Sequence, residues 1–128
     1  MKILILGGDG FCGWPTSLKL ASEGHDVTII DNLSRRLIDA ELQSNSLTDI
    51  YSIEERLVAT KKQNWNINFY NEDIKNYNRL LEIVAQTNPD AIVHFAEQRS
   101  APYSMIGEKQ RRYTVDNNVI TTHNILNT

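Results

Sequence analysis

The sequence predicts an α/β fold built on a doubly wound parallel sheet, and two observations support that prediction. Four short apolar runs typical of buried strands alternate with segments whose apolar residues recur at helical spacing. A glycine-rich stretch at residues 7–13 separates the first strand from the first helix. Alternating strands and helices imply parallel pairing and right-handed crossovers, with helices on both faces of the sheet. This is the Rossmann-type arrangement, in which the strands present here take the order 3-2-1-4.

The predicted strands are short β-rich runs that end at glycine, aspartate or a polar loop. They are expected at residues 2–6, 26–30, 67–70 and 91–95. The predicted helices run from Gly13 to a stop near Gly24, over about residues 52–62, across residues 77–84, and around residues 115–126. Residues 31–64 are otherwise polar and less regular, and residues 96–104 predict a polar loop.

The composition is that of an ordinary globular domain of 128 residues. Thirteen basic and sixteen acidic residues give a net charge of −3, which disfavours nucleic acid as the main partner. No run approaches the roughly 20 apolar residues of a membrane span, so no membrane association is expected. Because no targeting segment is visible either, we expect the prokaryotic cytoplasm, or the plastid stroma if the source is a plant or alga.

The glycine-rich stretch is typical of a phosphate-binding loop, and its spacing fits two patterns. Gly8, Gly10 and Gly13 fit G-x-G-x-x-G, whereas Gly7, Gly10 and Gly13 fit G-x-x-G-x-x-G. In either pattern one glycine makes the turn out of the strand, Gly10 lets a pyrophosphate approach the backbone, and Gly13 lets the helix pack closely. The start of that helix offers free N–H groups to phosphates. A dinucleotide site is therefore predicted, against a glycine-rich turn that binds nothing.

Asp31 ends the second strand, where a carboxylate can accept hydrogen bonds from both hydroxyls of an adenosine ribose. The same charge repels a 2′-phosphate, so NAD is favoured over NADP. Arg35 and Arg36 oppose that preference if they face the cofactor, but not if they lie in solvent or in salt bridges. Asp73, after the third strand, is expected either at the adenine or as the N-cap of the next helix.

The loop after the fourth strand is expected at the reactive end of the cofactor, because such sheets bind ligands where the strand order reverses. Arg99 is the candidate for an anionic group of the substrate, and the alternative is an ion pair with Glu97 or with another acid on the surface. His94 is expected to be a hydrogen-bonded core histidine rather than a catalytic base. Asn117 and Asn118 interrupt a helix that asparagine disfavours, which indicates hydrogen bonds to backbone or cofactor.

No metal site is predicted, because the three histidines are scattered and no zinc-ligand spacing is present. Cys12 has no second cysteine with which to form a disulfide. A packing or backbone-contact role for Cys12 is therefore favoured over a redox role.

These motifs resemble those of the extended short-chain dehydrogenase/reductases, which are NAD-dependent epimerases and dehydratases of nucleotide sugars. The resemblance covers the whole chain and rests on residues 7–14, 31–36, 73–74, 94–96, 97–105 and 117–119. It implies that NAD is held by Gly7, Asp9, Gly10, Phe11, Cys12, Gly13, Asp31, Asn32, Arg35, Arg36, Asp73, Ile74, Phe95 and Asn117. It also implies a substrate site at Arg99, Ser100 and Tyr103.

Residues 97–105 narrow the resemblance to the branch of the family that uses UDP-glucose and sulfite. The chemistry implied there oxidises the C4 hydroxyl of glucose, removes water across C5 and C6, adds sulfite at C6 and reduces C4 again. The product is a precursor of sulfolipid, and a homodimer is possible for the full-length enzyme. The alternatives are a UDP-glucose 4-epimerase or another nucleotide-sugar dehydratase, a non-catalytic dinucleotide-binding module, and a methyltransferase that uses S-adenosylmethionine.

The family's catalytic Tyr-x-x-x-Lys pair, with its helper threonine or serine, has no counterpart in these residues. Tyr103 is followed four positions later by Gly107, and Tyr113 by Asn117. Residues 1–128 are therefore expected to be the N-terminal part of a NAD(P)-binding Rossmann domain, cut before its fifth strand. They are expected to contain no catalytic residue and to be inactive alone.

Overall fold

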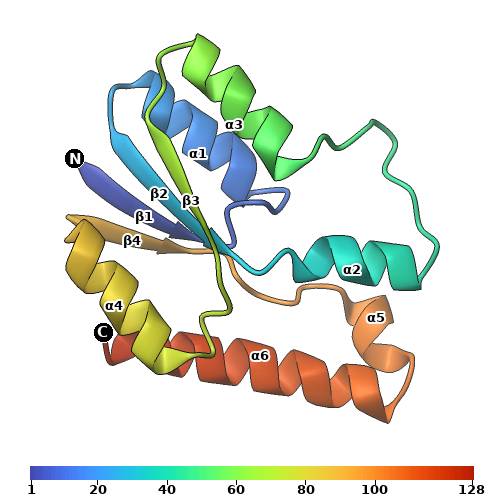
Figure 1. Ribbon diagram of the computed structural model, residues 1–128. Coiled ribbons are helices and arrows are strands. Elements are labelled where there is room, and N and C mark those ends of the chain that lie inside the picture. Colours follow the sequence, from blue (N-terminus) through green and yellow to red (C-terminus); the bar gives the residue numbers. More distant parts are fainter.

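The computed structural model describes residues 1–128 and contains one sheet of four strands (Figure 1). The strands are β1 (Lys2–Leu6), β2 (Asp26–Asp31), β3 (Ile67–Asn71) and β4 (Ala91–His94). Their order is β3-β2-β1-β4, and all three pairings are parallel. The predicted fold class and the predicted strand order are both confirmed.

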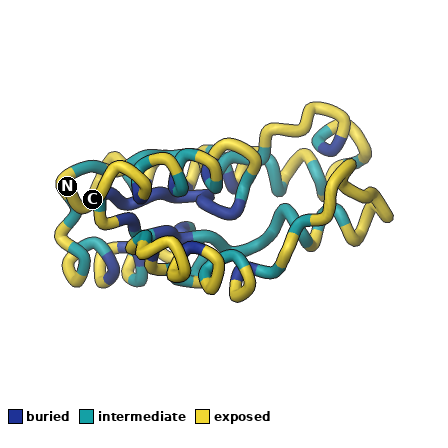
Figure 2. The backbone as a smooth tube through the Cα atoms, turned by 90° about the horizontal axis from the view of Figure 1, so that it is seen from above, coloured by how far each residue is buried: buried dark blue, intermediate teal, exposed yellow.

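Helices cover both faces of the sheet and extend beyond its carboxyl edge. They are α1 (Gly13–Ser22), α2 (Ser34–Glu41), α3 (Ile53–Lys62), α4 (Tyr77–Thr87), α5 (Ala101–Met105) and α6 (Glu108–Leu126). α1 and α3 lie on one face, α4 and α6 lie on the other, and α2 and α5 lie past the ends of the strands (Figure 1). Figure 2 shows the buried strands as a layer between two layers of helices.

Each face of the sheet has its own apolar core, because successive side chains of β1 point to opposite faces. Ile3 and Ile5 belong to the core beneath α1 and α3, whereas Leu4 and Leu6 belong to the core beneath α4 and α6. All four side chains are buried. Burial on both faces explains why the sequence of β1 is a continuous apolar run rather than an alternating one.

Two helices lie where the sequence predicts irregular structure. α2 falls within residues 31–64, and it escapes prediction because none of its residues is buried. α5 occupies part of the loop predicted at residues 96–104. Ser100 is the N-cap of α5, where its side chain accepts a hydrogen bond from the N–H of Tyr103, and Pro102 lies in the first turn of the helix.

Two predicted boundaries also shift. α6 begins at Glu108, well before Val115, because Glu108 suits the positive end of the helix dipole and pairs with Arg112 one turn later. β4 ends at His94, so Phe95 lies in the loop that follows the strand.

Side-chain hydrogen bonds stabilise the start of α3 and the position of α6. Ser52 and Glu55 form a capping box at the start of α3, which matches the helix predicted there. The side-chain amide of Asn124 on α6 donates to the carbonyl oxygens of Ile74 at 2.9 Å and Lys75 at 3.1 Å. These bonds tie α6 to the loop after β3.

None of the helices has the length and apolar character needed to cross a membrane.

Candidate functional site

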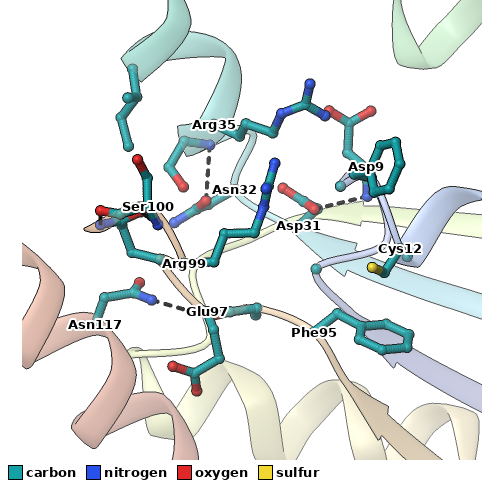
Figure 3. Close-up of a pocket in the computed structure, with 18 of the residues that line it drawn as sticks. Asp9, Cys12, Asp31, Asn32, Arg35, Phe95, Glu97, Arg99, Ser100 and Asn117 are labelled. Atoms are coloured by element: carbon teal, nitrogen blue, oxygen red, sulfur yellow. Dashed lines mark hydrogen bonds between the residues drawn. The ribbon is translucent and has the colours of Figure 1, made fainter. Parts of the chain in front are cut away.

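The carboxyl ends of the strands open into a cavity of about 550 Å³. Its wall is formed by the glycine loop, the end of β2, α2, the loops after β3 and β4, and parts of α5 and α6. Except for Arg36, all residues predicted for cofactor or substrate line it, and many are drawn in Figure 3. These lining residues are Gly7, Asp9, Gly10, Phe11, Cys12, Gly13, Asp31, Asn32, Arg35, Asp73, Ile74, Phe95, Arg99, Ser100, Tyr103 and Asn117.

The glycine loop uses the spacing Gly7-x-x-Gly10-x-x-Gly13. Gly7 has a φ of +79°, and a Cβ there would lie 2.6 Å from the amide nitrogen of Ala96. Gly7 therefore makes the turn out of β1 and passes close to the loop after β4. A Cβ on Gly13 would overlap the carbonyl oxygen of Gly7, so α1 starts closer to the loop than any side chain would allow.

The carboxylate of Asp31 is held at the cavity wall by two backbone N–H groups. The N–H of Asp9 donates to Oδ2 at 2.9 Å, and the N–H of Leu33 donates to Oδ1 at 2.7 Å. Leu33 has a left-handed φ of +56°, and its bond to Asp31 fixes the turn that leads into α2. Burial raises the pKa of Asp31 above the ordinary value of 3.8, although both N–H bonds act in the opposite direction.

Arg36 does not line the cavity, which corrects the expectation that it lies beside the adenosine. Its guanidinium forms a bidentate ion pair with Asp9, with Nε 2.7 Å from Oδ2 and Nη2 2.8 Å from Oδ1. Nη1 of Arg56, on α3, lies 3.0 Å from Oδ1 of the same carboxylate. The salt-bridge alternative therefore holds for Arg36. Sequence reasoning did not identify Arg56, because no local spacing connects α3 to the glycine loop.

Side-chain hydrogen bonds hold the loop after β4 in one shape. Oδ1 of Asn118 accepts from the N–H of Gln98 at 2.8 Å, and its Nδ2 donates to the carbonyl of Gln98 at 3.0 Å. The side chain of Gln98 then folds along the loop, where its Oε1 accepts from the N–H of Ser100 at 2.6 Å. Its Nε2 donates to the hydroxyl of Thr114 on α6 at 3.0 Å. The residues on both sides of Arg99 are therefore fixed.

Arg99 is exposed, and its side chain points into the cavity (Figure 3). The expected alternative, an ion pair with Glu97, is wrong, because Oε1 of Glu97 lies 2.8 Å from Nε2 of His94 and 3.0 Å from the hydroxyl of Thr122. His94 is hydrogen-bonded as expected, but it is not a core residue, because its side chain is 21% exposed. The guanidinium of Arg99 thus remains available to an anion inside the cavity.

For three further residues the sequence left two roles open, and the structure shows what each side chain contacts. Asn117 is buried and donates from Nδ2 to the carbonyl of Ala96 at 3.1 Å, so it bonds to the backbone. Asp73 does not cap α4, because Asn76 holds that position. Asp73 lines the cavity and accepts from the N–H of Lys75 at 2.9 Å. The Cys12 side chain is not packed in the core; Cys12 is exposed and lines the cavity.

The cavity also contains residues that sequence reasoning missed. Five of them come from or follow the unpredicted helix α2, namely Ser34, Ile38, Asp39, Leu42 and Ser44. Arg35 lies at the start of the same helix, with its Nε 3.7 Å from Asp39. The spacing of Ile38 and Leu42, four positions apart, was the available signal for an apolar helix face turned toward the cavity.

Comparison with known proteins gives the family. Residues 4–128 match the family model described as GDP-mannose 4,6 dehydratase. The chain belongs to this family. The match spans nearly the whole chain, so it includes the glycine loop, Asp31 and the loop that carries Arg99.

Two relatives with named activities are similar to the chain in sequence. The chain is 49% identical over 127 residues to the UDP-sulfoquinovose synthase of Sulfolobus acidocaldarius, covering 98% of this chain and 32% of that protein. It is 44% identical to the chloroplastic UDP-sulfoquinovose synthase of Spinacia oleracea, covering 98% of this chain and 26% of that protein. The chain therefore spans a third or less of the length of these relatives.

A solved structure of a named enzyme shares the fold. UDP-glucose 4-epimerase from Brucella ovis, in complex with NAD, superposes with a TM-score of 0.68 at 25% identity. The match covers 98% of this chain and 31% of that one. The Rossmann-type assignment made from the order of the strands agrees with this similarity.

Proposed function

We propose that this chain is the NAD-binding part of an enzyme that modifies nucleotide sugars, and specifically of a UDP-sulfoquinovose synthase. The observation that carries the proposal is the braced loop after β4, which presents the free guanidinium of Arg99 to the cavity beside the glycine loop. The two relatives named for this reaction are 49% and 44% identical to the chain, which supports the proposal further.

The cavity has the features that a dinucleotide requires. The turn at Gly7 and the close start of α1 at Gly13 leave backbone N–H groups without side chains in front of them, which suits a pyrophosphate. The fixed carboxylate of Asp31 suits the hydroxyls of an adenosine ribose. Asp73 and Ile74 line the cavity beyond Asp31, where the adenine would lie. We therefore assign NAD as the cofactor.

The substrate assigned to the cavity is UDP-glucose, and sulfite is the second reactant. NAD, when bound, would supply reversible hydride transfer at C4 of the sugar. Arg99 binds the anionic partner, because a guanidinium donates two parallel hydrogen bonds to phosphate or sulfonate oxygens. Overall, sulfite replaces the C6 hydroxyl and one water leaves. Residues 1–128 form the N-terminal part of the Rossmann domain. Proton transfer is assigned to a Tyr-x-x-x-Lys pair that lies outside these residues.

Product analysis with the purified full-length protein tests the reaction. With UDP-glucose, NAD and sulfite, we expect a sulfonated nucleotide sugar, detected by mass spectrometry, that forms only when sulfite is present. The relative from Brucella ovis is a UDP-glucose 4-epimerase, which makes epimerisation the second candidate. Formation of UDP-galactose with no use of sulfite would establish that candidate instead. Binding of NAD without turnover of either kind would indicate a non-catalytic module.

The raised pKa of Asp31 predicts that NAD affinity falls in mild acid. Only the ionised carboxylate accepts hydrogen bonds from both ribose hydroxyls, so affinity is full above the pKa of Asp31 and falls as the pH drops through it. Because burial places that pKa above 3.8, the fall begins at a higher pH than for an ordinary aspartate. Calorimetric titration with NAD from about pH 7 down to about pH 4 measures it.

The variant Asp31→Asn is the control for this titration. It carries no titrating group at the position, so its weaker NAD affinity should show no fall of its own over the same range. If the native protein shows no fall while its circular dichroism spectrum stays native, Asp31 does not bind the ribose in its ionised form.

A further inference from the structure

Asp9 is a buried carboxylate inside the glycine loop, and the proposed function assigns it no task. It is 2% exposed, although it follows two glycines at the edge of the cavity. We propose that Asp9 is a positioning residue that sets the preference for NAD over NADP by holding the guanidinium of Arg36 away from the adenosine ribose. This inference rests on the proposed function, because it requires that NAD binds in the cavity.

Two of the three guanidinium nitrogens of Arg36 are bonded to Asp9. Nε and Nη2 of Arg36 donate to the two oxygens of Asp9 at 2.7 and 2.8 Å. Nη2 also donates to the carbonyl oxygen of Tyr51 at 2.9 Å. A guanidinium is the group that best fits the oxygens of a phosphate, but the guanidinium of Arg36 is already bound to Asp9 and to the carbonyl of Tyr51.

Arg36 would otherwise be well placed to meet a 2′-phosphate. It follows Arg35, which lines the cavity, and it lies close enough to Asp31 for its charge to lower the pKa of that buried carboxylate, a smaller effect than burial. The N–H of Asp9 bonds to Asp31 at 2.9 Å, so one residue contacts both the ribose-binding carboxylate and the nearby cation.

Charge balance points in the same direction. Asp9 and Asp31 carry two negative charges, and Arg36 and Arg56 carry two positive charges, so these four groups are neutral together. The neighbouring Arg35 lies 3.7 Å from a counter-ion of its own, Asp39. Loss of the Asp9 charge leaves one positive charge uncompensated. The uncompensated charge is that of Arg36 rather than Arg56. The guanidinium of Arg56 lies 4.9 Å from the centre of the Trp14 ring, and this cation–π contact does not depend on Asp9.

The test compares the affinities of the full-length protein for NAD and NADP by calorimetry. In Asp9→Asn, the ratio of NADP affinity to NAD affinity should rise on the order of tenfold, the effect of one charge-assisted hydrogen bond gained. In the double variant Asp9→Asn with Arg36→Gln, the ratio should return to that of the native protein. A merely structural role for Asp9 would weaken both cofactors together and leave the ratio unchanged.

Further variants make the outcomes decisive. Arg36→Gln alone should leave the ratio unchanged, because Arg36 is unavailable while Asp9 holds it; a selective loss of NADP affinity in this variant would overturn the inference. Asp9→Ser, measured in parallel, removes the charge with a smaller side chain and should also raise the ratio. An unchanged ratio in whichever of the two Asp9 variants folds would overturn it too. If the native protein binds neither cofactor, the proposed function fails, which is a distinct result.

Discussion

Replacing Gly7 by alanine is expected to weaken NAD binding and to lower the free energy of unfolding. An alanine at a φ of +79° is strained, and its Cβ would lie 2.6 Å from the amide nitrogen and 2.7 Å from the Cα of Ala96. Because these neighbours are backbone atoms, they cannot relieve the clash by a change of side-chain rotamer. The two costs together amount to about 3 kcal/mol, measured by urea denaturation of the variant against the native protein.

The same substitution should also reduce NAD affinity at least about tenfold, because a displaced glycine loop loses hydrogen bonds to the pyrophosphate. Calorimetry measures this loss separately from stability. It distinguishes damage to the site from damage to the fold, since a variant that stays folded at the assay temperature still reports its affinity.

Gly24→Ala is the matched control for Gly7→Ala. Gly24 has a φ of +85°, but a Cβ there would meet no atom within 4 Å. It carries the backbone strain without the clash, so it should cost about 1 kcal/mol and leave NAD affinity unchanged. Equal losses of stability in the two variants would show that the contact with Ala96 is unimportant.

Replacing Arg99 by alanine is expected to reduce kcat/KM for UDP-glucose and sulfite about 10- to 100-fold while NAD affinity stays within about twofold of the native value. Arg99 lines the cavity with its guanidinium free, and the hydrogen bonds that brace its loop come from Gln98 and Asn118 rather than from Arg99 itself. Steady-state kinetics of the full-length protein, together with NAD titration, measures both quantities.

Two variants control this result. Arg99→Lys keeps the positive charge but loses the planar fork, so it should fall between the native protein and Arg99→Ala. Arg112→Ala removes an exposed arginine that pairs with Glu108 on α6, outside the cavity, and should leave kcat/KM unchanged. A parallel loss of NAD affinity in Arg99→Ala would mean that Arg99 supports the fold of the site instead of binding substrate.

Prediction from sequence succeeds for this chain where the pattern is local. The apolar run of β1 and the glycines that end it lie within a few residues of one another, so their spacing alone indicates strand, turn and helix. α2 escapes prediction for the converse reason. It buries no residue, and Arg36, one of its members, is bound to Asp9, which lies 27 residues away in the sequence.

The fold class and the segments that meet at the carboxyl edge of the sheet follow from the amino-acid sequence alone. Periodicity, which acts over a few residues, marks the strands and helices. Right-handed crossovers, each of which spans a strand–helix–strand unit, make the strands parallel, and the Rossmann-type arrangement gives their order. Which arginine is free depends on the tertiary structure. Arg36 and Arg99 are both candidates for an anion, but Asp9 binds Arg36 and no carboxylate binds Arg99. The choice of ion-pair partner depends on distances across loops, and no local spacing encodes those distances.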